Sequence, residues 1–113
     1  MKSKIIALSR NEEFKELLKK KRVSNKYVTI FFGKIENKNK NKLNISFVTK
    51  KKIGNAVKRN KIKRRLRNIV NDAVKNINLK FDYSYLVIAK PTMLNNHYTI
   101  IKETLFKDFE RIR

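Results

Sequence analysis

Apolar residues recur every three or four positions in three segments of the chain, and this spacing predicts three helices. We expect them at residues 11–20, 55–77 and 98–112, each with one apolar face. The apolar face of the longest helix consists of Ile62, Leu66, Ile69, Val70, Ala73, Val74 and Ile77. The corresponding residues are Phe14, Leu17 and Leu18 in the first helix and Ile101, Leu105, Phe109 and Ile112 in the last.

Three further segments have the composition of β-strands. Residues 27–35 are rich in β-branched and aromatic side chains, and residues 43–49 alternate apolar and polar as a half-buried strand does. Residues 85–89 are continuously apolar, which indicates a central strand that ends before Pro91. Residues 36–42 predict a polar loop or hairpin turn, and Gly54 permits positive φ in a turn over 50–55.

The order α, β, β, α, β, α predicts one α+β domain, an α/β sandwich over residues 1–113. We expect a mixed sheet of about four strands with three helices, the fourth strand arising if 27–35 divides in two. With 113 residues, 41% of them hydrophobic, the chain can build one modest core.

The charge of the chain predicts the kind of partner that it binds. The chain has 30 Lys and Arg against 9 Asp and Glu, for a formal net charge of +21. Because repulsion among these positive charges opposes compaction of the chain, a polyanionic partner is expected. Residues 37–71 hold 13 Lys or Arg and no acidic residue. Apolar residues run through this stretch at regular spacing, so it predicts a folded basic surface and not a disordered tail.

Composition also excludes several classes of protein. The chain has no cysteine, which excludes disulfides, thiolate metal sites and a cysteine nucleophile. Two Gly and one Pro exclude collagen-like and Pro/Gly-rich disordered chains. No apolar run reaches the ~18 residues needed to span a bilayer, and the apolar run at 5–8 is too short for a signal peptide. We therefore expect no membrane partner and a cytoplasmic location.

One flank of the long helix carries the candidate chemistry. Arg59, Lys63 and Arg67 form one i, i+4 row beside the apolar face, and the next row is Asn60, Arg64 and Asn68. Such a flank can contact successive phosphates of a nucleic acid, and Arg adds bidentate geometry. The alternative is a solvated helix face, but such faces usually interleave Glu with Lys. The Lys50, Lys51 and Lys52 triplet adds backbone amides at the N-terminal end of the helix, an anion-binding arrangement.

The segment from Lys51 to Arg67 reads KKIGNAVKRNKIKRRLR. It resembles the signature of the bacterial ribonuclease P protein subunit, K-x-G-x-A-V-x-R-N-R/K-x-K-R-x-x-R, and fills every fixed position. The likeness continues in the Asn-Glu-Glu-Phe helix near the N-terminus, the two following strands, the strand at 85–89 and the closing helix.

The resemblance implies a ribosomal-protein-like sandwich with a left-handed β-α-β crossover around the signature helix, although crossovers are right-handed by default. It implies a non-catalytic protein subunit of an endoribonuclease, a monomer within a ribonucleoprotein. Such a subunit binds the catalytic RNA and the 5′ leader of precursor tRNA, assists removal of the leader to give the mature tRNA 5′ end, and broadens substrate specificity. The chemistry, and most of the Mg²⁺ coordination, would belong to the RNA subunit.

The resemblance also implies roles for individual residues. By position, the residues that contact the catalytic RNA would be Arg59, Asn60, Lys61, Lys63, Arg64 and Arg67. Lys61 stands where many members have Arg, so this chain lacks the bidentate group there. Phe14 and Phe31 match aromatic positions of a leader-binding cleft between the first helix and the sheet, and Leu18 stands where several relatives have a second Phe. From the residues alone, Phe14 and Phe31 are better explained as core aromatics, and the resemblance brings the two interpretations closer to balance.

Nothing in the sequence composes a protein nuclease. The one histidine, His97, falls in an expected loop, and Asp72, Asp82 and Asp108 are isolated, which gives no two-metal carboxylate cluster. Three other functions stay open: a small ribosomal protein that binds rRNA, a DNA-binding regulator, and a protein-only nuclease. They would be distinguished by co-sedimentation with ribosomal subunits, by a dimer with a sequence-specific footprint, and by cleavage without an RNA subunit.

Overall fold

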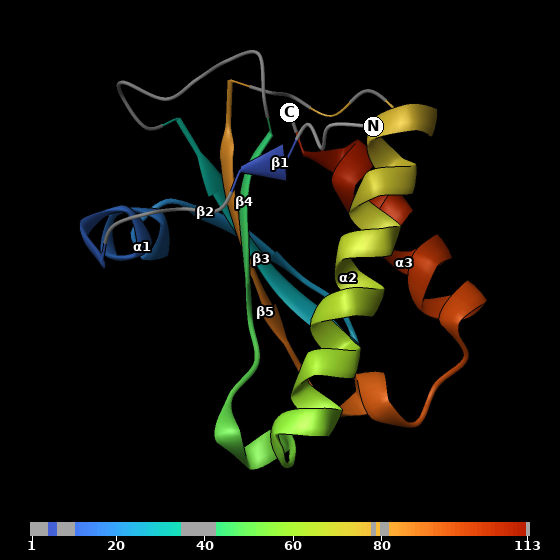
Figure 1. Ribbon diagram of the computed structural model, residues 1–113. Coiled ribbons are helices and arrows are strands. Elements are labelled where there is room, and N and C mark those ends of the chain that lie inside the picture. Colours follow the sequence, from blue (N-terminus) through green and yellow to red (C-terminus); the bar gives the residue numbers. More distant parts are fainter. Residues whose placement is uncertain (1–4, 7–10, 35–42, 78, 80–81, 113) are drawn as a thin grey trace.

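A five-stranded sheet divides the molecule into two unequal helical layers (Figure 1). The computed structural model describes residues 5–6, 11–34, 43–77, 79 and 82–112. Along the chain the elements are β1 (Ile5–Ile6), α1 (Asn11–Leu18), β2 (Lys21–Ser24), β3 (Val28–Gly33), β4 (Leu43–Val48), α2 (Ala56–Asn76), β5 (Ser84–Ala89) and α3 (Tyr98–Arg111). Short 3₁₀ helices at Lys51–Ile53 and Pro91–Leu94 precede α2 and α3.

The sheet is mixed, with the strand order β1-β4-β5-β3-β2. β4 runs parallel to β1 and β5, whereas β3 runs antiparallel to β5 and β2. β5 lies in the middle, which confirms the central strand expected from its continuous apolar run. The radius of gyration of 13.3 Å is that of a single compact domain of this length.

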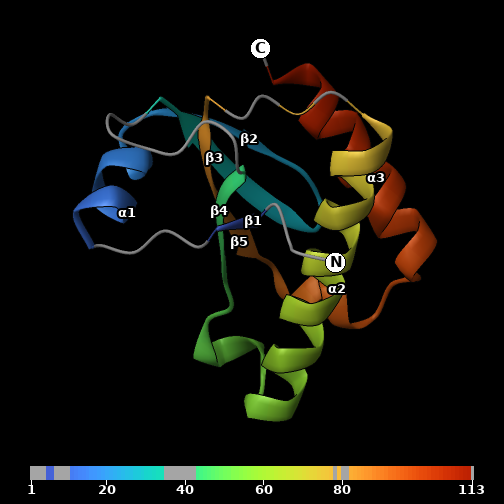
Figure 2. The ribbon, with the colours of Figure 1, turned by 45° about the horizontal axis from the view of Figure 1, so that its top comes forward.

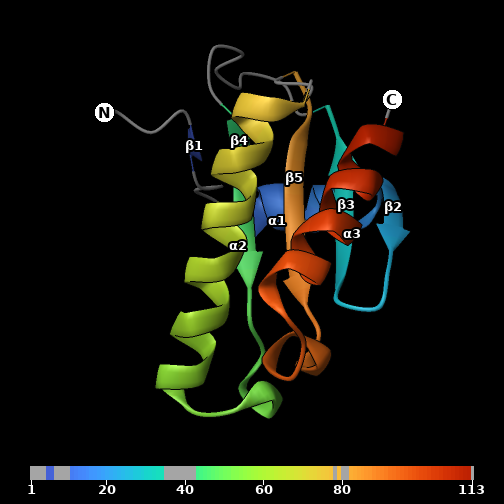
Figure 3. The same ribbon diagram turned by 90° about the vertical axis from the view of Figure 1, so that its right-hand side faces the viewer.

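The connection from β4 through α2 to β5 is a left-handed crossover. In Figure 3, β4 lies to the left of β5, both strands point downward, and α2 lies in front of the sheet. A chain that descends behind, ascends in front and moves to the right traces a left-handed turn. The handedness that the family resemblance implied is therefore present, against the usual right-handed rule.

The main core lies between the sheet and the layer formed by α2 and α3 (Figure 2). The predicted apolar faces are buried there: α2 contributes Ile62, Leu66, Ile69, Val70 and Ala73, and α3 contributes Ile101, Leu105 and Phe109. Among the described residues, the short helix α1 is the one helix on the opposite face, where Leu17 packs against Phe31 and Leu86. This face of the sheet, the α1 face, is thus the less completely covered one.

Several details differ from the sequence prediction. The additional strands are β1 and β2, outside the segment 27–35, which forms the single strand β3. The half-buried pattern expected for 43–49 is wrong at Asn44 and Ser46, which are 2% and 8% exposed. They are buried because β4 is an interior strand, between β1 and β5. The expected loop at 36–42 lies outside the described residues.

Candidate nucleic-acid interface

The N-terminal end of α2 is positioned by a turn and a side-chain cap. Gly54 has φ of +156°, and a Cβ there would approach Cδ of Lys58 to 2.8 Å, so the turn requires glycine. The Asn55 side chain then accepts a hydrogen bond from the Lys58 amide at 3.0 Å, the standard N-cap geometry. The predicted helix and turn are thus confirmed, and they fix the direction in which the basic residues project.

Six residues of α2 between positions 59 and 67 form what we call the basic ridge: Arg59, Asn60, Lys61, Lys63, Arg64 and Arg67. All are exposed except Arg59, which is half-buried. Its Nε is buried and has no hydrogen-bond partner among the described residues. Figures 1 and 3 show that the first turns of α2 extend past the end of the sheet, so this part of the ridge is open to a large partner.

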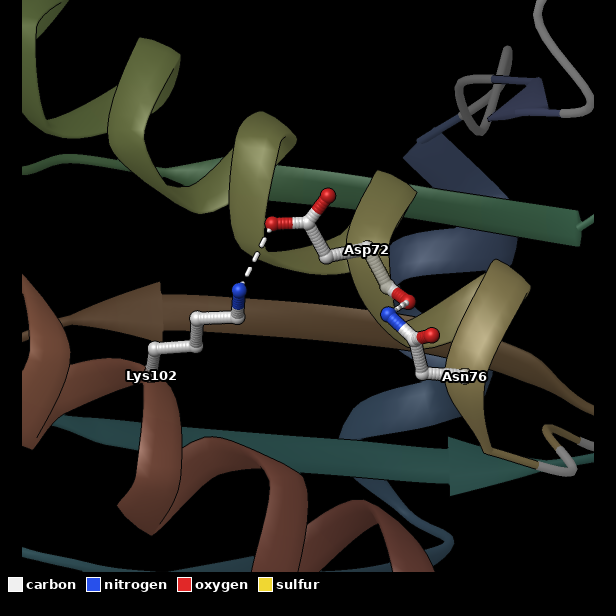
Figure 4. Close-up of polar contacts among 3 residues, drawn as sticks. All are labelled: Asp72, Asn76 and Lys102. Carbon is white, nitrogen blue, oxygen red and sulfur yellow. Dashed lines mark hydrogen bonds and ion pairs between the residues drawn. The ribbon is translucent and has the colours of Figure 1, made fainter.

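No acidic side chain offsets the charge of the ridge within the described part of the chain from 43 to 71. The first acidic residue of α2 is Asp72, and Lys102 of α3 donates to its carboxylate at 2.9 Å (Figure 4). This hydrogen bond raises the pKa of Lys102 above its ordinary value. Asn76 also donates to the main-chain carbonyl of Asp72, at 2.9 Å. Asp72 therefore serves the packing of α2 on α3, and the field of the ridge stays positive.

The lysine triplet lies just before α2 but does not cap it. Lys51 and Lys52 belong to the separate 3₁₀ helix, and Lys50 precedes it. All three side chains are exposed. The amides of Ile53 and Gly54 donate to the carbonyls of Lys50 and Lys51 within this turn. The triplet therefore offers ammonium groups beside the ridge, whereas capping of α2 is left to Asn55.

The predicted leader-contact residues lie on the α1 face. Phe31 of β3 is buried, at 8% exposure, against Leu17 and Leu86, and Phe14 is half-buried on the same cluster. Leu18 is 49% exposed. The structure brings Phe14 and Phe31 into one apolar cluster, to which Leu18 does not belong.

Two arginines take positions that the sequence reasoning did not assign. Arg22 on β2 lies directly opposite Phe31 in the antiparallel register, so both side chains belong to the α1 face, and Arg22 is exposed. The sequence held one sign of a special role for Arg22: the position is Arg in a chain whose basic residues are mostly Lys. Arg65 is half-buried, and its Nη1 makes a long 3.5 Å contact with the Met93 carbonyl, which links α2 to the turn before α3.

The described residues show no protein-based catalytic centre of the metal type. No group of three or more His, Asp or Glu side chains lies close enough together there to hold a metal ion. His97 is exposed at the residue before α3 and makes no side-chain cap. None of the helices in the described ranges is both long and apolar enough to cross a membrane.

The family model described as Ribonuclease P matches residues 3–113. The chain belongs to the ribonuclease P protein family. Two curated relatives named ribonuclease P protein component support this: one from Mesoplasma florum is 35% identical and covers 87% of this chain and 86% of its own length. Another, from Acholeplasma laidlawii, is 37% identical, and the match covers 88% of this chain and 81% of the relative's own length.

Solved ribonuclease P proteins share the fold. The protein from Thermotoga maritima superposes with a TM-score of 0.80 at 22% identity, over 96% of this chain and 98% of that one. The protein from Staphylococcus aureus superposes with a TM-score of 0.76 at 23% identity, over 94% of this chain and 93% of that one. As a ribonuclease P protein component, the chain is part of an endoribonuclease complex.

Proposed function

We propose that the chain binds the catalytic RNA of ribonuclease P through the basic ridge and the 5′ leader of precursor tRNA through the α1 face. In this role it assists Mg²⁺-dependent endonucleolytic removal of the leader. The observation that carries the proposal is the ridge itself: exposed cationic and amide groups on a rigid helix, without acidic neighbours in the described segment from 43 to 71.

The ridge matches RNA phosphates in both charge and spacing. Residues one helical turn apart rise by about 5.4 Å along the axis, which allows one side chain to meet each successive phosphate. Arg64 and Arg67 can make bidentate contacts, whereas Lys61 contributes a point charge. The buried Nε of Arg59 gains an acceptor when a phosphate oxygen reaches it. Lys50, Lys51 and Lys52 extend the same positive surface.

The α1 face suits a single-stranded leader. Phe14 is half-buried and provides aromatic surface, Leu18 adds exposed apolar area, and the exposed Arg22 lies opposite the buried Phe31. Stacking on aromatic side chains tolerates any base and is worth about 1–3 kcal/mol per base. Contacts of this kind would broaden substrate specificity, because they add affinity without reading sequence.

Mg²⁺ enters the proposal as an ion held mainly by RNA. The described residues do not fit a protein-based Mg²⁺ site, because their carboxylates are not clustered. The protein's own contribution is electrostatic: its cations neutralise phosphate repulsion where the catalytic RNA and the substrate meet. Less Mg²⁺ is then needed to bring the two RNAs together.

The test is cleavage of precursor tRNA by the RNA subunit at low Mg²⁺, with and without the full chain. We expect the chain to raise the cleavage rate strongly at low Mg²⁺ and only weakly at high Mg²⁺. A Lys107→Gln variant, which removes one exposed charge from α3, should act like the natural protein. Equal rates with and without the chain at every Mg²⁺ concentration would refute the proposal.

A further inference from the structure

A small pocket lies at the end of the sheet where β3 ends and β5 begins. Its volume is about 190 Å³, and its lining consists of Lys20, Lys21, Phe32, Gly33, Lys34 and Tyr83. Gly33 pairs with Ser84, the first residue of β5, whereas β4 and β5 run from there toward the start of α2. The pocket is therefore at the opposite end of the sheet from the lysine triplet and the first turn of the basic ridge (Figure 1).

The apolar part of the pocket is aromatic and held in place by the core. The rings of Phe32 and Tyr83 stack with centroids 6.0 Å apart and an angle of 28° between their planes. Phe32 is 6% exposed and Tyr83 is half-buried. The ring centroids of Tyr83 and Tyr85 are 6.5 Å apart. The ring of Tyr85 in turn packs edge-on against that of Phe109 in α3, with centroids 5.9 Å apart. A flat ring could therefore rest on a surface that is already ordered.

The rim of the pocket is cationic. Lys20, Lys21 and Lys34 are all exposed. The stem of Lys20 packs over Gly33, where a Cβ would lie only 2.9 Å from Cγ of Lys20. The ammonium of Lys34 is 3.5 Å from Asp82, but both side chains are well exposed, so this pair is weak. A ligand with a negative charge next to a flat ring matches both halves of the pocket.

We propose that this pocket binds one unpaired nucleotide of a single-stranded RNA. The base would lie against the half-buried ring of Tyr83, which stacks on the buried Phe32, and the flanking phosphates would meet Lys20, Lys21 and Lys34. An acidic peptide would satisfy the lysines but would leave the aromatic surface without a partner. Since Lys21, Phe32 and Tyr83 belong neither to the basic ridge nor to the cluster around Phe31, the site goes beyond the function proposed above.

The chain offers a direct readout, because it contains only two glycines. Gly33 lines the pocket and Gly54 lies in the turn before α2, so protein labelled with ¹⁵N-glycine gives one amide signal for each region. Titration of the full chain with the ribotrinucleotide ApApA should shift the Gly33 signal saturably. Inorganic phosphate at matched ionic strength should shift it much less, because phosphate has no ring.

Substitutions at Tyr83 and Lys21 separate the contribution of the aromatic ring from that of the positive charge. Tyr83→Leu should weaken the ApApA affinity reported by Gly33 about 5-fold or more, whereas Tyr83→Phe should retain it. Lys21→Gln should lower the salt dependence of binding by about 0.7 in the log–log slope. Tyr98→Leu and Lys107→Gln on α3 serve as matched controls and should change neither quantity. An unchanged Gly54 signal without ligand shows that each variant is folded.

Three outcomes would overturn the proposal. The first is a Gly33 signal that ApApA does not move, and the second is an equal response to phosphate and ApApA, which would mean an anion site only. The third is natural affinity in both Tyr83→Leu and Lys21→Gln. None of them affects the proposed function, which is tested by cleavage of precursor tRNA and does not involve Gly33.

Discussion

Neighbouring residues of the signature segment divide between folding and binding. Ile62 and Leu66 are at most 1% exposed and belong to the main core, whereas Lys63 and Arg64 between them face solvent. A helix places such neighbours about 100° apart, so one short segment can serve both tasks. Substitutions at the first pair should therefore act on stability, and under the function proposed above those at the second should act on RNA affinity.

Arg64 provides a prediction at this scale. Because its guanidinium is exposed on the basic ridge, Arg64→Gln should weaken binding of the catalytic RNA and leave the melting temperature nearly unchanged. The plot of log affinity against log salt should become less steep by about 0.9 for one lost duplex phosphate contact. Lys75→Gln, on an exposed site near the other end of α2, is the control. A slope that stays the same in Arg64→Gln would argue against a phosphate contact there.

The placement of single side chains was predictable only where a regular helix fixes their direction, and the roles of these residues stay predictions. The ridge followed from spacing, because the faces of α2 can be drawn before its partners are known. The pairing of Arg22 with Phe31 could not be predicted, because it depends on the register of two strands, and β2 was not expected. Arg65 has the same composition signal as Arg64, and its orientation toward Met93 depends on tertiary packing.

At the scale of elements, a polar contact between Lys102 and Asp72 joins α3 to α2. Lys102 and Asp72 come from different helices, 30 residues apart in sequence, and their side chains are partly exposed. The packing of the two helices is therefore stabilised mainly by their buried apolar residues, and the Lys102–Asp72 contact helps to orient one helix on the other.

This contact should make stability depend on pH in the alkaline range. The pKa of Lys102 is raised in the folded protein by its hydrogen bond to Asp72. The stabilisation is thus complete below the unfolded lysine pKa of about 10.4 and is lost as pH rises through the higher folded value. Melting temperatures of the natural protein and Asp72→Asn should differ at pH 8 and converge as pH rises past the folded pKa of Lys102. A difference that is constant with pH would show that the ion pair does not contribute.

The long helices and the six-residue strands were predictable, whereas the two shortest strands were not. The helix at 55–77 was expected almost to the residue, because seven apolar positions at helical spacing define it. β1 has two residues and β2 has four, which is too few for a period to be recognised. Alternation marked the two faces of β4 but not their exposure, which depends on the neighbouring strands.

The charge of the whole molecule sets its response to salts. A net charge of +21 on a chain of this size destabilises the compact state through repulsion, and the densest described part lies from Lys50 to Arg67. Anions that bind the folded form stabilise it by mass action. Sulfate or phosphate should therefore raise the melting temperature more than chloride at equal ionic strength. Equal effects of the three anions would mean that the charge is not organised into anion sites.

The position of β5 in the sheet has a consequence for synthesis of the chain. β5 pairs with β3 on one side and β4 on the other, yet it is the last strand to leave the ribosome. Until residue 89 has emerged, β4 and α2 have no completed sheet to pack against, and the ridge is part of an unfinished polycation. The nascent chain thus meets cellular RNA before its own core is closed, and the speed at which β5 arrives limits how long that exposure lasts.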